Sequence, residues 1–185
     1  MIKIGITGSL ASGKSTVVKL MSKRKYPIFN ADKEVAILYK KKVFINKIKK
    51  KFKLKKVNNL KSEIKSLIKK DSSVLKKLEK IIHPLVRREM RKFMKKRKNY
   101  KIGLFEVPLL IESKLMKHFD VIVFVNAKKN KRRLRFKGKK EIFTTLDKRQ
   151  INAGKKIKFC DHVINNNYSM NKLKNKVKIL INSYE

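Results

Sequence analysis

The stretch that decides the fold is Gly8 to Ser15, which reads GSLASGKS and satisfies the pattern G-x-x-x-x-G-K-[S/T]. An apolar run with isoleucine at every second position, Ile2 to Ile6, precedes it. Apolar residues at helical spacing follow it between Val17 and Met21. A strand, a loop and a helix in this order form the context in which the pattern binds phosphate groups. The sequence therefore predicts an α/β fold of the P-loop NTPase type.

The residue types of this loop indicate its chemistry. Glycines permit positive φ angles and close backbone approach, so that successive amide hydrogens can point at phosphate oxygens. We expect Lys14 to bridge the β- and γ-phosphates of ATP and to act in catalysis, and Ser15 to give its hydroxyl to Mg²⁺. The loop residues expected to bind ATP are Gly8, Ala11, Ser12, Gly13, Lys14, Ser15 and Thr16.

Further apolar runs predict the remainder of a parallel sheet. Residues 102–107 and 121–125 are runs of the kind found in sheets that are covered on both faces. Shorter runs at 27–29 and 163–164 complete a five-stranded parallel sheet flanked by helices. A last helix is expected after Ser169, which is a suitable N-cap.

The length of 185 residues fits a single domain, residues 1–185, with one α/β core. We expect this core to comprise residues 1–32 and 99–185. Between about residues 33 and 98 the apolar residues keep a period of 3.6, which predicts helices and no strand.

The formal net charge of +40 raises the alternative of a basic nucleic-acid-binding protein that uses ATP as a switch. Only nine of the 53 basic residues are arginine, which is the residue best suited to phosphate and base recognition. The lysines are spread evenly, and no basic motif is interleaved with aromatic residues. We therefore expect no specific nucleic-acid partner.

Cysteine content and hydropathy argue against a disulfide-bonded, a zinc-binding or a membrane-spanning protein. The single cysteine, Cys160, cannot form an internal disulfide, and we expect it to be a small buried hydrophobic residue. No spacing of cysteine and histidine indicates a zinc site. No uncharged apolar run reaches 18 residues, so we expect a soluble, cytoplasmic protein without a membrane partner.

The P-loop by itself does not separate a kinase from a GTPase. A guanine-specific protein would ordinarily carry Asn-Lys-x-Asp after a late strand, whereas residues 126–129 read NAKK. A kinase acting on a small molecule fits the chain best. Within this class, a metabolite kinase similar to shikimate kinase is kept as an alternative.

Asp32 follows the second predicted strand. The carboxyl ends of parallel strands meet at the edge of the sheet where ligands bind, so we expect this carboxylate close to the P-loop. Its expected role is to accept the proton of the attacking hydroxyl, or to orient that hydroxyl. The alternative is an N-cap for a helix that starts near Lys33.

Several short motifs follow one another along the chain. They are GITG at 5–8 with the P-loop, NAD at 30–32, HPL at 83–85, VPLLIE at 107–112, Gln150, and DHVINN at 161–166. In this order they resemble the dephospho-CoA kinase family. The resemblance covers about residues 2–168, and its His-Pro and Val-Pro-Leu-Leu elements are more specific than the P-loop.

The resemblance implies transfer of the γ-phosphate of ATP, with Mg²⁺, to the ribose 3′-hydroxyl of dephospho-CoA. The products are CoA and ADP, and the reaction is the last step of coenzyme A biosynthesis. It also implies that residues about 33–98 bind the acceptor, that residues about 130–150 form a small lid, and that Asp32 is the catalytic base and a substrate contact. The other implied contacts are His83, Arg87, Glu106 and Glu112 for the acceptor, and Arg133 and Arg135 for ATP. We expect a monomer or a weak homo-oligomer.

The residues alone leave other roles open. His83 precedes a proline and is typical of a helix boundary. Glu106 and Glu112 are typical of carboxylates that are solvated or paired with lysines. Arg133 and Arg135 are typical of a solvated basic face.

Three positions depart from the family pattern. Asn30 stands where Asp-Ala-Asp has its first aspartate, which removes a negative charge. Ala11 stands where glycine is common, and its methyl group fits if φ stays negative. Lys137 lies in the short lid where an arginine is expected, and a lysine cannot make the same forked contact.

Overall fold

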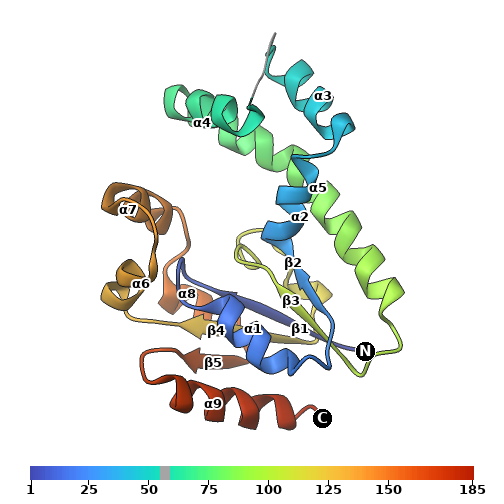
Figure 1. The fold of residues 1–185 in the computed structure, drawn as a ribbon, viewed down its shortest axis with the longest axis vertical. Helices are drawn as coiled ribbons and strands as arrows, with labels where there is room; N and C mark the ends of the chain where they lie inside the picture. Colours follow the sequence, from blue (N-terminus) through green and yellow to red (C-terminus); the bar gives the residue numbers. More distant parts are fainter. Residues whose placement is uncertain (55–58) are drawn as a thin grey trace. The chain divides into compact units, whose positions relative to one another are not determined.

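A computed structural model describes residues 1–54 and 59–185 (Figure 1). Contacts within the chain divide it into two compact units. The sheet unit comprises Met1–Asn30 and Phe93–Glu185, and the helical unit comprises Ala31–Lys92. The expectation of one kinase domain over the whole chain stays a prediction.

The sheet unit is built on five parallel strands in the order β2-β3-β1-β4-β5. The five-stranded parallel sheet predicted from the apolar runs is therefore confirmed. In register, Ile6 lies opposite both Glu106 and Val123. The strands are β1 (Ile2–Gly8), β2 (Ile28–Asn30), β3 (Ile102–Glu106), β4 (Val121–Asn126) and β5 (His162–Asn165).

Two helices, α1 (Lys14–Ser22) and α9 (Met170–Asn182), share a hydrophobic core with the sheet. Val17 of α1 and Val177 of α9 are almost fully buried in this core, together with Ile4 and Val123 of the strands. The predicted N-cap is confirmed, because Ser169 accepts a hydrogen bond from the backbone N–H of Lys172. Burial of these aliphatic side chains is the main stabilising contribution here.

Aromatic rings from distant parts of the chain form a second cluster in the sheet unit. Phe105 of β3 lies in its middle, with ring centroids 6.0 Å from Phe29, 5.5 Å from Phe93 and 5.4 Å from Phe119. The rings are tilted or edge-on to one another, which is the favourable arrangement for aromatic pairs.

The segment between β4 and β5 is helical. It contains α6 (Lys129–Arg135), α7 (Lys140–Lys148) and α8 (Ala153–Ile157). A single 3₁₀ turn, η1 (Met116–His118), precedes β4. We use "lid segment" for residues 129–150, which include α6 and α7.

The helical unit has its own core, in which Leu38, Phe44, Ile48 and Leu78 are almost fully buried. Its helices are α2 (Ala31–Leu38), α3 (Lys42–Lys51), α4 (Leu60–Lys70) and most of α5 (Ser73–Lys96). The described part of this unit contains no strand, as expected. The part of the predicted helical region at 55–58 lies outside the described residues.

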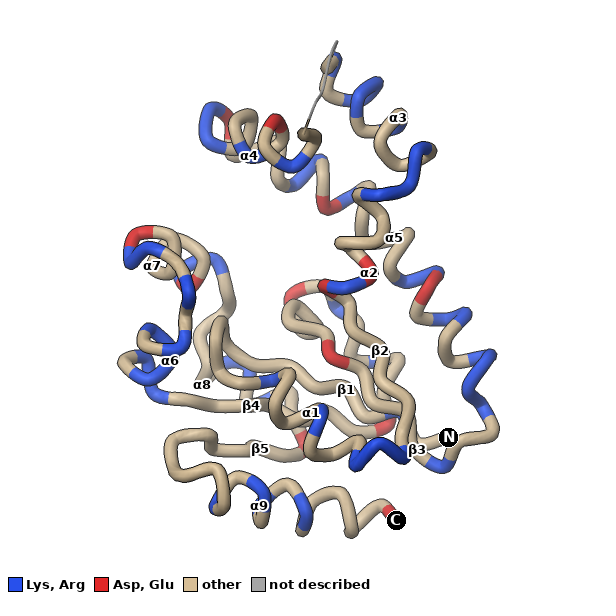
Figure 2. Tube along the Cα trace, in the orientation of Figure 1, with Lys and Arg blue, Asp and Glu red and all other residues tan. Residues whose placement is uncertain are grey.

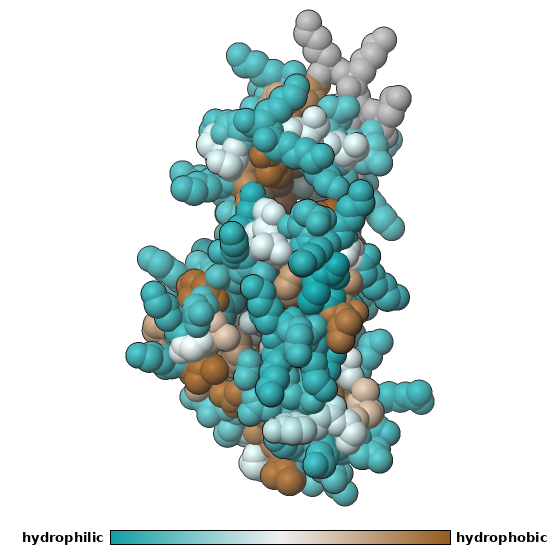
Figure 3. All heavy atoms as spheres, turned by 90° about the vertical axis from the view of Figure 1, so that its left-hand side faces the viewer, coloured by the Kyte–Doolittle hydropathy of each residue, from teal (hydrophilic) through white to brown (hydrophobic). Residues whose placement is uncertain are grey.

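The positive charge is distributed along the whole chain (Figure 2). The face shown in Figure 3 is mostly hydrophilic, with hydrophobic residues in separate groups. Among the basic residues that the structure describes, only Lys14, Arg132 and Lys156 are buried. No helix formed by residues 1–54 and 59–185 is long and apolar enough to cross a membrane.

Candidate functional site

The P-loop connects β1 to α1, and two of its glycines are required by the surrounding atoms. Gly8 has φ +154°, and a Cβ added to it would lie 2.4 Å from the carbonyl oxygen of Val125. Gly13 has φ +93°, and its added Cβ would lie 2.2 Å from the side-chain nitrogen of Asn166. A side chain at residue 8 would therefore collide with the backbone of β4, and one at residue 13 would displace the Asn166 side chain and adopt a strained φ.

Ala11 also has a positive φ, of 56°, so the condition under which its methyl group would fit without strain, a negative φ, is not met. This is the left-handed region, in which the Cβ of an L-residue lies too close to its own backbone. The position has the backbone conformation that favours glycine, although alanine occupies it. The loop therefore carries local strain at Ala11.

Lys14 begins α1 and is buried, with its ammonium group folded onto the P-loop backbone. Its Nζ donates to the carbonyl oxygens of Gly8, at 3.2 Å, and Ser9, at 3.0 Å. The amides of Lys14, Ser15 and Thr16 lie in the first turn of α1, where backbone N–H groups lack acceptors within the helix. This end of α1 is suited to phosphate oxygens.

Ser15, Glu106 and Asn30 form a hydrogen-bonded chain at the carboxyl ends of three neighbouring strands. The Ser15 hydroxyl donates to Oε1 of Glu106 at 2.6 Å, and the Asn30 side-chain amide donates to Oε2 at 2.6 Å. Glu106 itself is 5% exposed. A hydroxyl and a carboxylate are oxygen ligands of the kind Mg²⁺ takes, so this pair fits the ion. The described part of the chain contains no group of three carboxylate, histidine or cysteine side chains that could hold a metal by itself.

The loop before α9 contacts the other side of the P-loop. The buried side chain of Asn166 donates to the carbonyl oxygen of Ser12 at 2.8 Å. Arg135, from α6, donates to the carbonyl oxygen of Asn166 at 3.0 Å and to that of Ser12 at 3.5 Å. Of the two predicted lid arginines, Arg135 therefore lies against the P-loop. Arg133 is half-buried, and its side chain forms no hydrogen bond or ion pair with the residues that the structure describes.

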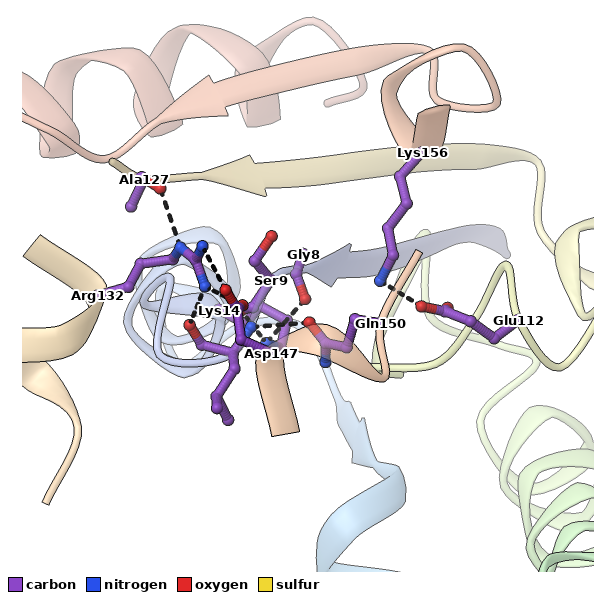
Figure 4. A network of polar contacts seen from close by, with 10 residues as sticks. Gly8, Ser9, Lys14, Glu112, Ala127, Arg132, Asp147, Gln150 and Lys156 are labelled. Atoms are coloured by element: carbon purple, nitrogen blue, oxygen red, sulfur yellow. Dashed lines mark hydrogen bonds and ion pairs between the residues drawn. The ribbon is translucent and has the colours of Figure 1, made fainter. Parts of the chain in front are cut away.

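A third arginine of the lid segment, Arg132, was not among the predicted site residues. It is buried, pairs through both Nη atoms with the Asp147 carboxylate, and donates from Nε to the carbonyl oxygen of Ala127 at 3.1 Å (Figure 4). Nothing in the sequence distinguishes it from Arg133, because the distinction is set by which side of α6 faces the P-loop. Asp147 and Asn166 were also absent from the predicted contacts.

Glu112, predicted to contact the acceptor, instead forms an ion pair with Lys156 of α8. The Nζ of Lys156 lies 2.5 Å from Oε1 of Glu112, and the lysine side chain is fully buried (Figure 4). The contact is an ion pair, and neither Nζ of Lys156 nor Oε2 of Glu112 has a hydrogen-bond partner in the described part of the chain. The same Oε1 accepts from the backbone N–H of Ile151 at 3.3 Å. The ion pair matches the alternative stated for Glu112, a carboxylate paired with a lysine. A role for Glu112 in binding the acceptor stays a prediction.

The other predicted residues lie in the helical unit. Asp32 is exposed in the first turn of α2, which begins at Ala31, so it is inside the helix and not at the N-cap. His83 and Arg87 are one helical turn apart on α5 and share a face. Helix α5 continues through Pro84, so His83 is not a helix boundary. Burial lowers the pKa of His83, and the Arg87 charge lowers it further, while Glu79 opposes the shift.

Comparisons with known proteins show which family the chain resembles. The family profile described as dephospho-CoA kinase matches residues 2–172. A dephospho-CoA kinase of Rickettsia typhi is 32% identical over 189 residues, covering 100% of this chain and 98% of the relative. A dephospho-CoA kinase of Fusobacterium nucleatum is 34% identical, covering 95% of this chain and 94% of the relative.

Solved structures have the same fold. A Thermus thermophilus protein superposes with a TM-score of 0.84 at 26% identity, covering 98% of this chain and 97% of the other. A dephospho-CoA kinase from Campylobacter jejuni has a TM-score of 0.72 at 22% identity, covering 98% and 96%. The family profile and the relatives span nearly the whole chain. The chain therefore belongs to the dephospho-CoA kinase family and is an ATP-dependent kinase.

Proposed function

We propose that this chain transfers the γ-phosphate of Mg-ATP to the ribose 3′-hydroxyl of dephospho-CoA, giving CoA and ADP. The observation that carries the proposal is the chain Ser15–Glu106–Asn30 beside Lys14, in a protein of this family. It supplies oxygen ligands, a fixed carboxylate and a cation at the helix terminus where phosphates bind.

The proposed phosphate site uses the P-loop residues predicted from sequence. Lys14 leaves the carbonyl oxygens of Gly8 and Ser9 and binds the β- and γ-phosphates. Ser15 would hold Mg²⁺ through its hydroxyl, and Glu106 would bind the ion through water or contact the substrate. When bound, Mg²⁺ neutralises charge that develops on the phosphoryl oxygens.

In the proposed chemical step, the Asp32 carboxylate accepts the proton of the acceptor hydroxyl. The hydroxyl oxygen forms a bond to the γ-phosphorus while the bond from that phosphorus to the β,γ-bridging oxygen breaks, and ADP leaves. The support for Asp32 is its match to the second aspartate of the family motif and its exposed position directly after the end of β2.

The proposal also assigns residues that bind the acceptor and residues of the lid segment that bind ATP. His83 and Arg87, on one face of α5, bind dephospho-CoA, and Glu106 and Glu112 are further proposed contacts. Arg133 and Arg135 bind ATP from the lid segment. Arg135 has support in its contact with the backbone of Ser12, because a guanidinium there is close to the phosphate-binding loop.

The cellular setting is also proposed. We propose a cytoplasmic enzyme, monomeric or weakly self-associating, with no specific nucleic-acid or membrane partner. The absence of a specific nucleic-acid partner is supported by the even spread of Lys and Arg along the described trace (Figure 2).

The experiment is ADP release from Mg-ATP in the presence and absence of dephospho-CoA, with product analysis for CoA. Shikimate tests the alternative kinase class, and RNA tests a nucleic-acid-stimulated ATPase. ADP formation that depends on dephospho-CoA is the expected result. A protein that binds ATP but is stimulated by shikimate or RNA alone would contradict the proposal.

A further inference from the structure

The two polar backbone atoms of Leu10, inside the P-loop, are both bound by side chains of the lid segment. The N–H of Leu10 donates to Oε1 of Gln150 at 2.9 Å. The carbonyl oxygen of Leu10 accepts from Nη1 of Arg132 at 3.3 Å. These contacts join residues 140 and 122 positions apart in the sequence. Leu10 is thus held from both sides by groups outside the loop.

The lid groups that hold Leu10 are themselves fixed. The guanidinium of Arg132 is anchored by the Asp147 carboxylate and by the carbonyl oxygen of Ala127, and lies 5.6 Å from the ring centroid of Phe143. Gln150 lies two residues after the end of α7, and its backbone N–H donates to the carbonyl oxygen of Asp147 at 3.2 Å. Figure 4 shows Arg132, Asp147 and Gln150 gathered at the P-loop. An anchored donor and an anchored acceptor can impose a conformation on the backbone between them.

The residue that follows Leu10 is the strained Ala11, with φ 56°. An isolated alanine leaves this region readily, because the left-handed conformation costs about 1–2 kcal/mol per residue. Strained residues persist where the surrounding structure over-determines them. Arg132 binds the carbonyl oxygen of the Leu10–Ala11 peptide, and Gln150 binds the N–H of the Ser9–Leu10 peptide before it. The two hydrogen bonds therefore restrict the two successive peptide groups that lead into the strained φ.

We propose that Gln150 and Arg132 are positioning residues that hold the Leu10–Ala11 turn of the P-loop in its phosphate-binding conformation. Nucleotide affinity then depends on the lid segment through the loop backbone, in addition to any direct contact of the lid with ATP. The inference rests on the proposed function for the identity of the bound nucleotide. The support that Gln150 and Arg132 give to the Leu10–Ala11 turn does not depend on the proposed function.

The first test is the exchange of the Leu10 amide hydrogen in the ligand-free protein, measured by NMR. Gln150→Met has a side chain of similar length but no acceptor for the Leu10 N–H. We expect faster exchange at Leu10 in this variant and no change in Thr145→Ala, an exposed change on α7 that removes only a bond within the helix. Unchanged exchange at Leu10 in Gln150→Met would overturn the proposal.

The second test is ADP binding by calorimetry. We expect Gln150→Met to weaken ADP binding by about three- to tenfold, the effect of losing one hydrogen bond. In the Ala11→Gly background the same change is expected to have less than half of this effect, because glycine needs no support at a positive φ. An equal loss in both backgrounds, with unchanged thermal midpoints, would show that Gln150 does not act by holding Ala11.

A kinetic readout separates positioning from general destabilisation. Gln150→Met is expected to raise the KM for ATP while the KM for dephospho-CoA stays within twofold of that of the unchanged protein. A parallel rise of both would contradict the inference. If the unchanged protein binds ADP but ignores dephospho-CoA, the proposed acceptor is wrong, while the exchange and ADP results still decide on the positioning role.

Discussion

The side-chain amide of Asn30 donates to the carboxylate of Glu106 from the position directly opposite it in the register of β2 and β3. In the related motif an aspartate stands at residue 30, and it would bring a second carboxylate against Glu106. The amide lets Glu106 keep a fixed orientation toward Ser15 without a neighbouring negative charge.

Asn30→Asp is expected to make stability depend on Mg²⁺. Two carboxylates in contact repel each other when both are ionised, and a divalent cation relieves the repulsion. We expect the melting temperature in EDTA to fall by about 2–4 °C, the shift for about 1 kcal/mol in a chain of this size, and to recover with Mg²⁺. Asn126→Asp, at the end of β4 beside Asn165, is the matched control and should not respond to Mg²⁺. Equal melting temperatures of Asn30→Asp with EDTA and with Mg²⁺ would contradict the assignment of Ser15 and Glu106 as the magnesium-binding pair.

Asp32→Asn is expected to lower kcat by about 10²–10⁴-fold, the range for loss of a general base. Its affinity for ADP should remain within twofold of that of the unchanged protein. Glu34→Gln is the control, since Glu34 is the other acidic residue in the first turn of α2. Comparable losses of kcat in both variants would indicate that the charge of the turn, and not Asp32 itself, is what matters.

Lys156→Met is expected to destabilise the fold by about 2–3 kcal/mol, somewhat less than a wholly buried pair because the Glu112 side chain keeps 17% exposure. The change leaves a carboxylate in the interior without its cation. Adding Glu112→Gln should restore part of the loss, and Lys155→Met, at the exposed neighbour, should have little effect. Urea unfolding monitored by circular dichroism measures all four proteins. A loss in Lys155→Met as large as in Lys156→Met would refute a specific role for the pair.

Cys160 is expected to react slowly with thiol reagents. Burial raises its pKa to about 11, and Asp161 contributes to the shift. Because only the thiolate reacts, its fraction at pH 8 is roughly a hundredfold smaller than for a thiol of pKa 9. The chain has one cysteine, so the absorbance change with a disulfide reagent reports this site alone. Native protein should react far more slowly than protein in urea, and equal rates would disprove the prediction.

His83 is expected to stay neutral at pH 7 in the folded protein. Its pKa lies below the ordinary value of 6.5 because burial and Arg87 disfavour the proton. The folded state therefore binds fewer protons at this site than the unfolded state. The stability contribution is fully present above the unfolded pKa and is lost as the pH falls through the folded one. Two-dimensional NMR titration, with the His83→Gln variant used to assign the ring signal, should give a midpoint below that measured in urea. A midpoint above the urea value would mean that folding raises the pKa of His83, which would contradict the prediction.

The strands and the phosphate-binding loop could be predicted from sequence because their signals are local. A continuous apolar run such as Val121–Val125 and a fixed spacing of Gly8, Gly13 and Lys14 depend little on distant residues. The positive φ of Ala11 could not be predicted, because it accompanies contacts from Gln150 and Arg132 on the preceding residue. The continuation of α5 through Pro84 was missed for a similar reason, since tertiary packing outweighs the hydrogen bond that proline removes.

The partners of the charged residues were the least predictable part of the site. Arg132 and Arg133 are adjacent and chemically identical, yet only Arg132 enters the interior. Glu112 lies in a family motif, and its partner Lys156 lies 44 positions later on a short helix. Such pairings are decided by the three-dimensional fold and leave no periodic pattern in the sequence.

Burial of only three basic residues within the described chain has a consequence for how this sequence can change over generations. Lys14, Arg132 and Lys156 are each held by specific oxygen atoms, so replacement of any of them disturbs the fold or the loop. The other described lysines and arginines are at least partly in contact with water, where most substitutions alter stability little. Mutational bias in a genome can therefore add or remove surface lysines while the interior stays under selection. The high net charge of the surface can therefore change with little loss of stability, whereas the three interior cations cannot be replaced at the same low cost.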